Sequence, residues 1–573
     1  MKYGNHIYQR LSIFTLAAFV RAVLGYIFYG SIDVSAFIGI NAHTLNGTLV
    51  QHPPAIWCSF PVIPFYLWFC GLLGINTSLP LAFCFKIVPI FFDALLAVLL
   101  YDLMMRIRPA ESFKIGMLYA LSPVALIITC IHGQWEAVSF FFFLLALYIR
   151  TCYVPSYISY FCYGLFFAFS FMLKPFALVL SLLFFVPIPS FKQQLGVWWR
   201  YLMWLLCAIA GVLGVFFLMF KMHKSMSLDV LISPWIVGVK VLLLGVLVGL
   251  LLKTKPWSSF SLNFKRNLSL QLMAVAGLLS MVIFILLAFT VYGFNVFRMI
   301  DKILRYFNNG IQMFGLPYAW PFTIGPCALI LKNRFWIMGV LALFAYLYYR
   351  CLLDIYYAVL CLSMFIFSVS GLSPQYLFWV IPLLLITGFY RVAALFNIVC
   401  TVFFVMYYLN PLTNPDVPYQ SMLSFAALKP YAWLMPPEIL TRTWSLPWIW
   451  LLGNYVIPLL CLSVVAWIMI HCRAGQCKLV CKQEPFVWFN GYLLISALVT
   501  GLIAMLMATV STVGWAARFK ELITQAPWNY AVVVIDRCIS GAYGPVYWWN
   551  IGFVLIVGAL VWGVVVYKRK LHV

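Results

Sequence analysis

The sequence predicts an all-α fold, a polytopic bundle of transmembrane helices. Of the 573 residues, 65% are hydrophobic and only 9% are charged, and the mean hydropathy is +1.03. Soluble domains carry about 25% charged residues. Repeated apolar runs of about 18 to 23 residues match a hydrocarbon core roughly 30 Å thick. These runs do not alternate as barrel strands do, and inside lipid a helix satisfies its own backbone polar groups.

The positive charge of the chain predicts membrane topology. The formal net charge is +23, with 36 Lys and Arg against 13 Asp and Glu. The cations gather in short clusters between apolar runs, as the positive-inside rule expects of cytoplasmic loops. We do not expect nucleic-acid binding. The clusters placed on the cytoplasmic side are Arg106, Arg108 and Lys114; Lys253, Lys255, Lys265 and Arg266; Arg473, Lys478 and Lys482; and Lys568, Arg569 and Lys570.

The first spans enclose one long outer loop. Span one is expected over 11–30; this run holds Arg21 and lacks a small-residue cleavage site, so we interpret it as an anchor and not as a signal peptide. The outer stretch 31–80 follows, and its aromatic, Pro-broken part at 57–71 predicts helices that lie in the membrane interface. Span two is expected over 81–105 and span three over 115–131.

The remaining apolar runs predict a core followed by C-terminal helices. Counted in full, the runs give an odd number of spans, whereas the charge clusters place both termini inside. The short runs at 317–331 and 335–348 are therefore candidates for a re-entrant segment. We predict a transmembrane core over 1–390 and additional helices with outer loops over 391–573. Further spans are expected at 137–150, 157–173, 175–190, 199–220, 235–253, 268–292, 352–370, 375–390, 392–409, 447–470, 487–509 and 548–567.

A polar cluster between two apolar runs is the first candidate for a site. His132, Gly133, Gln134, Trp135 and Glu136 follow span three on the outer side. An ionisable side chain near bilayer depth costs several kcal/mol unless it faces a cavity or a partner, so it marks a candidate functional site. The imidazole and the amide suit hydroxyls or a phosphate, and the indole suits a sugar ring. The alternative is an aromatic belt with incidental polar neighbours.

A second carboxylate is expected on the same side of the membrane. Asp33 directly follows span one, so it and Glu136 can converge from elements distant in sequence. A carboxylate hydrogen-bonded to an incoming nucleophile can act as a general base. The alternative for Asp33 is a solvated helix cap.

Charged residues elsewhere complete the candidate site. Lys86 and Asp93 lie seven residues apart in span two, on nearly the same helical face, where either a structural ion pair or a substrate contact explains them. The outer cations suit a phosphate, although lipid headgroups are the alternative. These cations are Lys174, Arg298, Lys302 and Arg305, and the interfacial amide and phenol of Gln375 and Tyr376 are a weaker signal.

In their order along residues 10–390, these features resemble the GT-C superfamily of integral membrane glycosyltransferases. The resemblance rests on the early acid Asp33, the stretch His52-Pro53-Pro54, Lys86 and Asp93, Ser122-Pro123, Gly133-Gln134-Trp135-Glu136, Leu173-Lys174-Pro175, and Ser373-Pro374-Gln375-Tyr376. Enzymes of this superfamily use polyprenyl- or dolichyl-phosphate sugars as donors. Glu136 stands where Asp is common in the family motif.

The resemblance implies a hexosyltransferase, with mannose or glucose favoured. Asp33 would be the catalytic acid residue, acting on an acceptor hydroxyl of a glycan, glycolipid or protein. Membrane lipids surround such an enzyme, and a divalent metal is possible but not required, because the first outer loop has no Asp-x-Asp pair. The substrate-binding candidates are His52, Lys86, Asp93, His132, Gln134, Trp135, Glu136, Lys174, Arg298, Arg305, Gln375 and Tyr376.

A transporter or flippase of lipid-linked sugars is the alternative function. It predicts ionisable residues near the bilayer midplane and broken helices in two related halves, and the sequence shows no such halves. For location, a bacterial plasma membrane is favoured. The sequons at Asn46 and Asn76 are compatible with an endoplasmic-reticulum membrane.

Overall fold

The protein, seen in a computed structural model, is helical throughout its described part. The structure describes residues 2–28, 34, 70, 79–174, 177, 180, 269–282, 343–344, 347, 353–369, 374–409, 451–472 and 479. Nearly all of these residues are helical and none lies in a β-strand, which confirms the predicted all-α fold for this part. The chain divides into two compact units, Phe185–Met273 and the rest, and every helix discussed below belongs to the larger unit.

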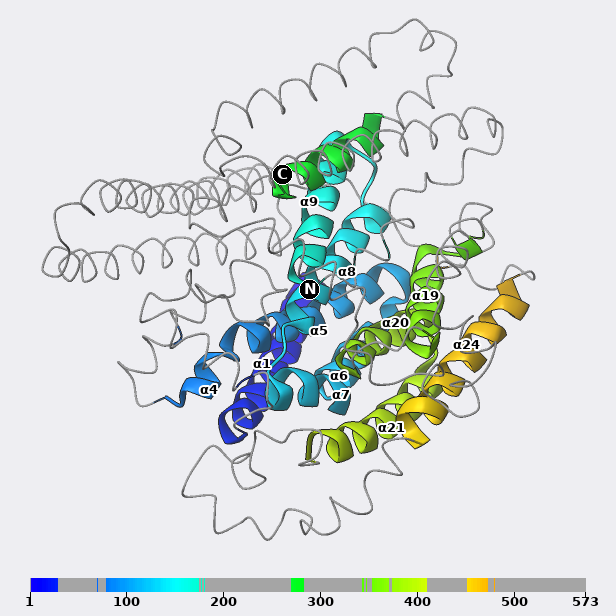
Figure 1. Ribbon diagram of the computed structural model, residues 1–573. Helices are drawn as coiled ribbons and strands as arrows, with labels where there is room; N and C mark the ends of the chain where they lie inside the picture. The colour runs from blue at the N-terminus through cyan, green and yellow to red at the C-terminus, as the bar shows by residue number, and fades with distance from the viewer. Residues whose placement is uncertain are drawn as a thin grey trace, which may run out of the picture. The chain divides into compact units, whose positions relative to one another are not determined.

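The described helices carry the labels of Figure 1. In the first half they are α1 (Lys2–Ile27), α4 (Leu81–Cys84), α5 (Ile87–Ile107), α6 (Ser112–Ala120), α7 (Pro123–Leu126), α8 (Glu136–Cys152) and α9 (Tyr157–Leu173). Later come α19 (Ile355–Val369), α20 (Val380–Thr387), α21 (Tyr390–Leu409) and α24 (Ile457–Cys472). Short 3₁₀ or π-helical segments are η1 (Pro109–Glu111), η2 (Ile127–His132), η6 (Pro374–Trp379) and η9 (Leu452–Val456).

Several of these helices suit a membrane. Three are long and apolar enough to cross one, His6–Ile27, Ile87–Ile107 and Leu452–His471. A fourth crossing results if the pair Pro109–Ala120 and Pro123–His132, bent by 42°, counts as one span. The described part is therefore compatible with a membrane protein, while the number of crossings in the whole chain stays a prediction.

Two predicted spans are interrupted. Span two, expected over 81–105, is divided into α4 and α5 at Phe85 and Lys86. Span three bends between α6 and α7 because Pro123 has no N–H to donate to the preceding turn. The Ser122 hydroxyl accepts a hydrogen bond from the Ala125 N–H and so caps the new helix.

The apolar run expected as one span over 375–390 is also divided. It begins as the 3₁₀ segment η6 and continues as the eight-residue helix α20. Gly388 ends α20 with a φ of 87°, a left-handed conformation that favours glycine. A Cβ at this position would also overlap the guanidinium of Arg108. The helical part of this run is thus too short to cross a bilayer alone.

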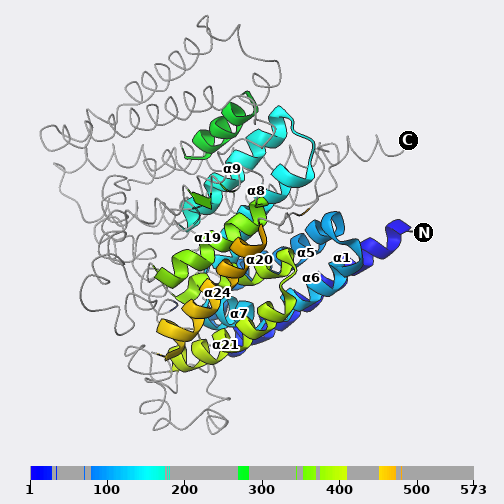
Figure 2. The same cartoon turned by 90° about the vertical axis from the view of Figure 1, so that its right-hand side faces the viewer.

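The helices form two adjoining groups. Helix α5 packs against α1, α6 and α8, and α8 packs against α9. In the second group α19 packs against α20 and α24, and these helices lie beside the first group in Figures 1 and 2. Aromatic rings join the groups: the Trp379 ring centroid lies 4.9 Å from that of Phe140 and 5.3 Å from that of Phe143. All three side chains are fully buried, so this aromatic contact belongs to the core of the bundle.

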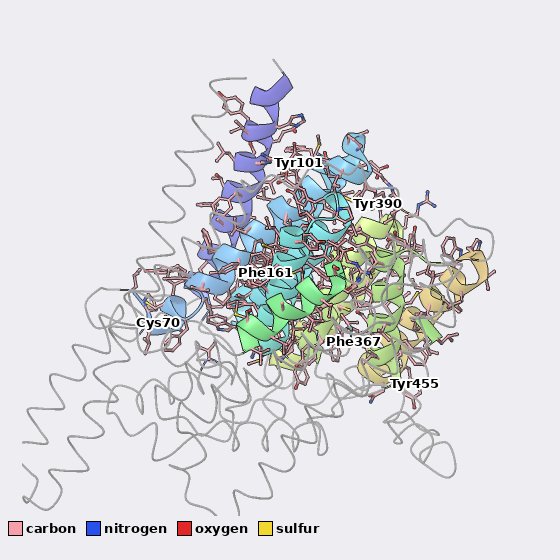
Figure 3. The ribbon with its side chains drawn as sticks, turned by 90° about the horizontal axis from the view of Figure 1, so that it is seen from above. Cys70, Tyr101, Phe161, Phe367, Tyr390 and Tyr455 are labelled. Carbon is pink, nitrogen blue, oxygen red and sulfur yellow. The ribbon has the colours of Figure 1, made fainter. Side chains whose placement is uncertain are left out.

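The two ends of the bundle differ in their chemistry. At one end, called the Arg10 end, α1 begins and α5 finishes, and the Arg10 guanidinium lies 2.7 Å from Asp102. At the other, the Gly133 end, α1 finishes, α5 begins, and the chain turns from η2 into α8 at Gly133. Figure 3 shows Tyr101 and Tyr390 toward the Arg10 end and Cys70 toward the Gly133 end.

A buried ion pair connects α1, α5 and α6. Arg21 Nε donates to Asp93 Oδ2 over 2.6 Å, and the Tyr119 hydroxyl donates to Asp93 Oδ1 over 2.5 Å. Arg21 Nη1 also donates to the Ala120 carbonyl over 2.6 Å. Ala120 is the last residue of α6, so the guanidinium satisfies a carbonyl that the bend deprives of its helical partner. Arg21 and Asp93 are fully buried.

We expect Asp93→Asn to destabilise the protein strongly, because it leaves the Arg21 guanidinium buried without a counter-ion. Removing one partner of a buried pair costs about 3–5 kcal/mol. The double variant R21M/D93L removes both charges and should unfold closer to wild type than either single variant does. The midpoint of thermal unfolding in detergent, Tm, measures this.

Lys114→Met is the matched control for this measurement. Lys114 is exposed on α6, so its loss should leave the Tm nearly unchanged. A Tm of Asp93→Asn equal to that of wild type would show that the pair does not hold α1 to α5.

Candidate functional site

The turn at the Gly133 end combines two uncommon backbone features, a π-helical segment and a left-handed glycine. The π-helical segment η2 finishes at His132, and Gly133 follows with a φ of 76°. The Gln134 N–H donates to the Ile128 carbonyl over 3.1 Å. A Cβ on Gly133 would lie 2.7 Å from Val34 Cγ2, so glycine is required by both backbone and space. π-Helical turns are frequent at functional sites.

An ion pair and an amide form the centre of the candidate site. The Lys174 ammonium lies 3.0 Å from Glu136 Oε1 and donates to Gln134 Oε1 over 2.9 Å. Glu136 is the first residue of α8, and Lys174 directly follows α9. The pair therefore depends on how these two helices pack.

Paired serines fix the packing of α8 on α9. The Ser139 hydroxyl donates to the Ser170 carbonyl over 2.9 Å, and the Ser170 hydroxyl donates to the Ser139 carbonyl over 2.7 Å. Ser139 lies one helical turn after Glu136, and Ser170 lies one turn before Lys174. These reciprocal bonds hold the two charged side chains in register.

Glu136 keeps capacity to bind a ligand. Its side chain is fully buried, whereas that of Lys174 is 14% exposed. Although Lys174 is within ion-pair distance, neither carboxylate oxygen accepts a well-oriented hydrogen bond from the described residues. An ionised carboxylate has about four acceptor sites, and buried polar groups are normally satisfied. The Glu136 carboxylate therefore has acceptor sites left for hydrogen bonds.

Lys86 lies against the same turn. Its Cε lies 3.4 Å from the point that a Cβ on Gly133 would occupy. The ammonium donates to the Phe28 carbonyl over 2.6 Å and to the Gly25 carbonyl over 3.4 Å. Lys86 thus ties the end of α1 to the start of α5. These two helix ends flank the predicted outer stretch 31–80.

Most of the predicted residues that the structure describes gather at this end of the bundle. His132 and Trp135 are buried in the turn beside Gln134 and Glu136, and Lys86 and Lys174 contact it. Asp33 lies outside the described residues, but its neighbour Val34 is buried and adjoins Gly133. His52, Arg298, Lys302 and Arg305 also lie outside them.

Three further candidates lie in other parts of the bundle. Both oxygens of Asp93 are engaged by Arg21 and Tyr119 inside the bundle, so its contacts favour the structural alternative. Gln375 and Tyr376 lie in η6, where the Tyr376 ring stacks on Phe367 with centroids 6.5 Å apart.

Sequence reasoning did not identify Arg21 as the partner of Asp93. A signal existed, because an arginine inside an apolar run needs a buried counter-ion and acids are scarce in this chain. The paired serines Ser139 and Ser170 carry no comparable signal. Among the described residues, no three His, Cys, Asp or Glu side chains lie close enough to hold a metal ion.

Comparisons with known proteins identify no family for this chain. No protein-family model matches the chain, and no curated protein and no solved structure is detectably similar to it.

We expect Lys174→Met to lower the Tm more than Glu136→Gln does. The lysine variant leaves the fully buried carboxylate without a cation, whereas the glutamine variant leaves a partly exposed ammonium that still contacts Gln134. Lys114→Met is the control, because Lys114 is exposed on α6 and its loss should leave the Tm unchanged. A larger loss in Glu136→Gln than in Lys174→Met would contradict the ion pair.

Proposed function

We propose that the chain is a multi-pass membrane glycosyltransferase of the GT-C kind. It transfers a hexose, with mannose or glucose favoured, from a polyprenyl-phosphate donor to an acceptor hydroxyl on the outer or lumenal side. The observation that carries the proposal is the buried Glu136 carboxylate, which has acceptor capacity left beside Lys174 and Gln134. A carboxylate, an amide and an indole together are typical of sites that bind sugar hydroxyls and ring faces.

In the proposed reaction the acceptor oxygen attacks the anomeric carbon of the donor sugar. The bond between that carbon and the phosphate oxygen breaks, the lipid phosphate leaves with the electron pair, and the configuration inverts. Asp33 takes the proton of the acceptor hydroxyl as general base. Gln134 and Glu136 hold sugar hydroxyls, and fixed charges stabilise the departing phosphate.

A lipid-linked donor suits the surface of the described helices. Helix α1 exposes large apolar side chains along its length, among them Leu11, Phe19 and Val23. Such side chains are compatible with contact to acyl or polyprenyl chains, with the donor head at the Gly133 end. We propose a glycan, glycolipid or protein as the acceptor and favour a bacterial plasma membrane over the endoplasmic reticulum.

A flippase of lipid-linked sugars is the second candidate, and two observations favour it. The Arg21–Asp93 pair is buried within its helices, and α6 and α7 form a broken helix pair. The charges of that pair already neutralise each other, and both oxygens of Asp93 are engaged by Arg21 and Tyr119. The unsatisfied carboxylate lies at the helix end instead, and this favours the enzyme.

Transfer of radiolabelled hexose from polyprenyl phosphate in proteoliposomes tests the proposal. We expect Asp33→Asn to lower kcat by about 10²-fold or more, the range of general acid–base catalysis. Glu136→Gln should lower kcat/KM by about tenfold, as expected when one charged hydrogen bond to the sugar is lost. The wild type should form glycoside with inverted configuration.

Glu111→Gln is the matched control, because Glu111 is half-exposed beside Arg108 near the Arg10 end and should not affect transfer. Unchanged transfer in Asp33→Asn would remove Asp33 from the mechanism. Movement of lipid-linked sugar across the bilayer without glycoside formation would favour the flippase.

A further inference from the structure

Lys86 is a buried lysine without a counter-ion among the described residues. Its side chain is fully buried, and its hydrogen-bond acceptors are the backbone carbonyls of Phe28 and Gly25. No carboxylate from the described part of the chain lies within ion-pair distance of its ammonium. Two carbonyls at the end of α1 favour a cation. They do not neutralise it.

Two other cations of the bundle, the buried Arg21 and the partly exposed Lys174, are paired with carboxylates. The Arg21 guanidinium lies 2.6 Å from Asp93, and the Lys174 ammonium lies 3.0 Å from Glu136. Leaving a buried ion uncompensated costs several kcal/mol. Lys86 therefore differs from its neighbours in the way expected of a residue whose counter-ion belongs to a bound molecule.

The surroundings of Lys86 suit an anion. It directly precedes α5, a 21-residue helix whose first turn contains no acidic residue, so the positive end of the helix dipole adds to its charge. An ammonium has three donors, and the two carbonyls use two of them. One donor is left for an oxygen of the anion.

We propose that Lys86 binds the phosphate of the lipid-linked donor, an inference that rests on the proposed transferase function. Lys86 adjoins Gly133, and the sugar-binding candidates Gln134 and Glu136 follow in the same turn. A sugar phosphate bridges these groups, with its phosphate at Lys86 and its hydroxyls at the amide and carboxylate. Lys174 then positions Glu136, and the phosphate charge is stabilised by Lys86 instead of by Lys174.

Binding of a long-chain polyprenyl monophosphate without sugar tests this inference. Affinities are measured by native mass spectrometry of the full chain in lipid nanodiscs. We expect Lys86→Met to weaken binding by about tenfold or more, because a charge-assisted hydrogen bond is lost. Lys86→Arg should retain most of the affinity. The neutral polyprenol should bind wild type and Lys86→Met equally, since it lacks the phosphate.

Lys114→Met is the matched control and should bind the phosphate as wild type does. Equal affinity of Lys86→Met and wild type for the phosphate overturns the inference, and the transferase proposal survives if wild type still forms glycoside. Absence of polyprenyl phosphate binding to wild type, together with absence of transfer, contradicts both.

A second measurement uses the wild-type protein, so that a folding defect in the variant cannot decide the outcome. A polyprenyl phosphate with a photoreactive group next to the phosphate should label peptides from residues 79–100 or 132–136. Labelling confined to other segments overturns the inference.

Discussion

The buried ion pair between Arg21 and Asp93 is the interaction on which the rest of the described bundle depends. It joins α1 to α5, and through Tyr119 and the Ala120 carbonyl it reaches the bend of the third span. Arg21 and Asp93 neutralise each other and Tyr119 bonds to Asp93, so charges that would be costly inside lipid become a fixed cross-link. Because the helices are held there, their ends at Gly133 lie in a fixed relation to one another.

The charges of the first half of the chain then fall into two kinds. Arg21 and Asp93 neutralise each other inside the bundle, where both side chains are fully buried. At the Gly133 end, and among the residues that the structure describes, Glu136 lacks a well-oriented donor and Lys86 lacks a carboxylate, although both side chains are fully buried. The first kind stabilises the fold. The second kind supports our proposal that a sugar and a phosphate bind at this end.

Sequence reasoning predicted the helices well and their interruptions poorly. Hydropathy is a sum over many residues, so it located α1, α5 and α9. Breaks depend on single residues such as Pro123 and Gly388, whose effect an average conceals. The clustering of His132, Gln134 and Glu136 was visible because they adjoin in sequence. Contacts such as Lys174 with Glu136 follow from the packing of α8 on α9, which no local pattern specifies.

The most direct test of the account is an experimental structure of the protein in lipid with a non-hydrolysable polyprenyl-phosphate sugar. The account predicts the sugar against Gln134 and Glu136, the phosphate within hydrogen-bond distance of Lys86, and the Asp33 carboxylate facing the anomeric carbon. A headgroup bound at the Arg10 end, or an Asp33 side chain walled off from Glu136 by packed protein, would contradict it.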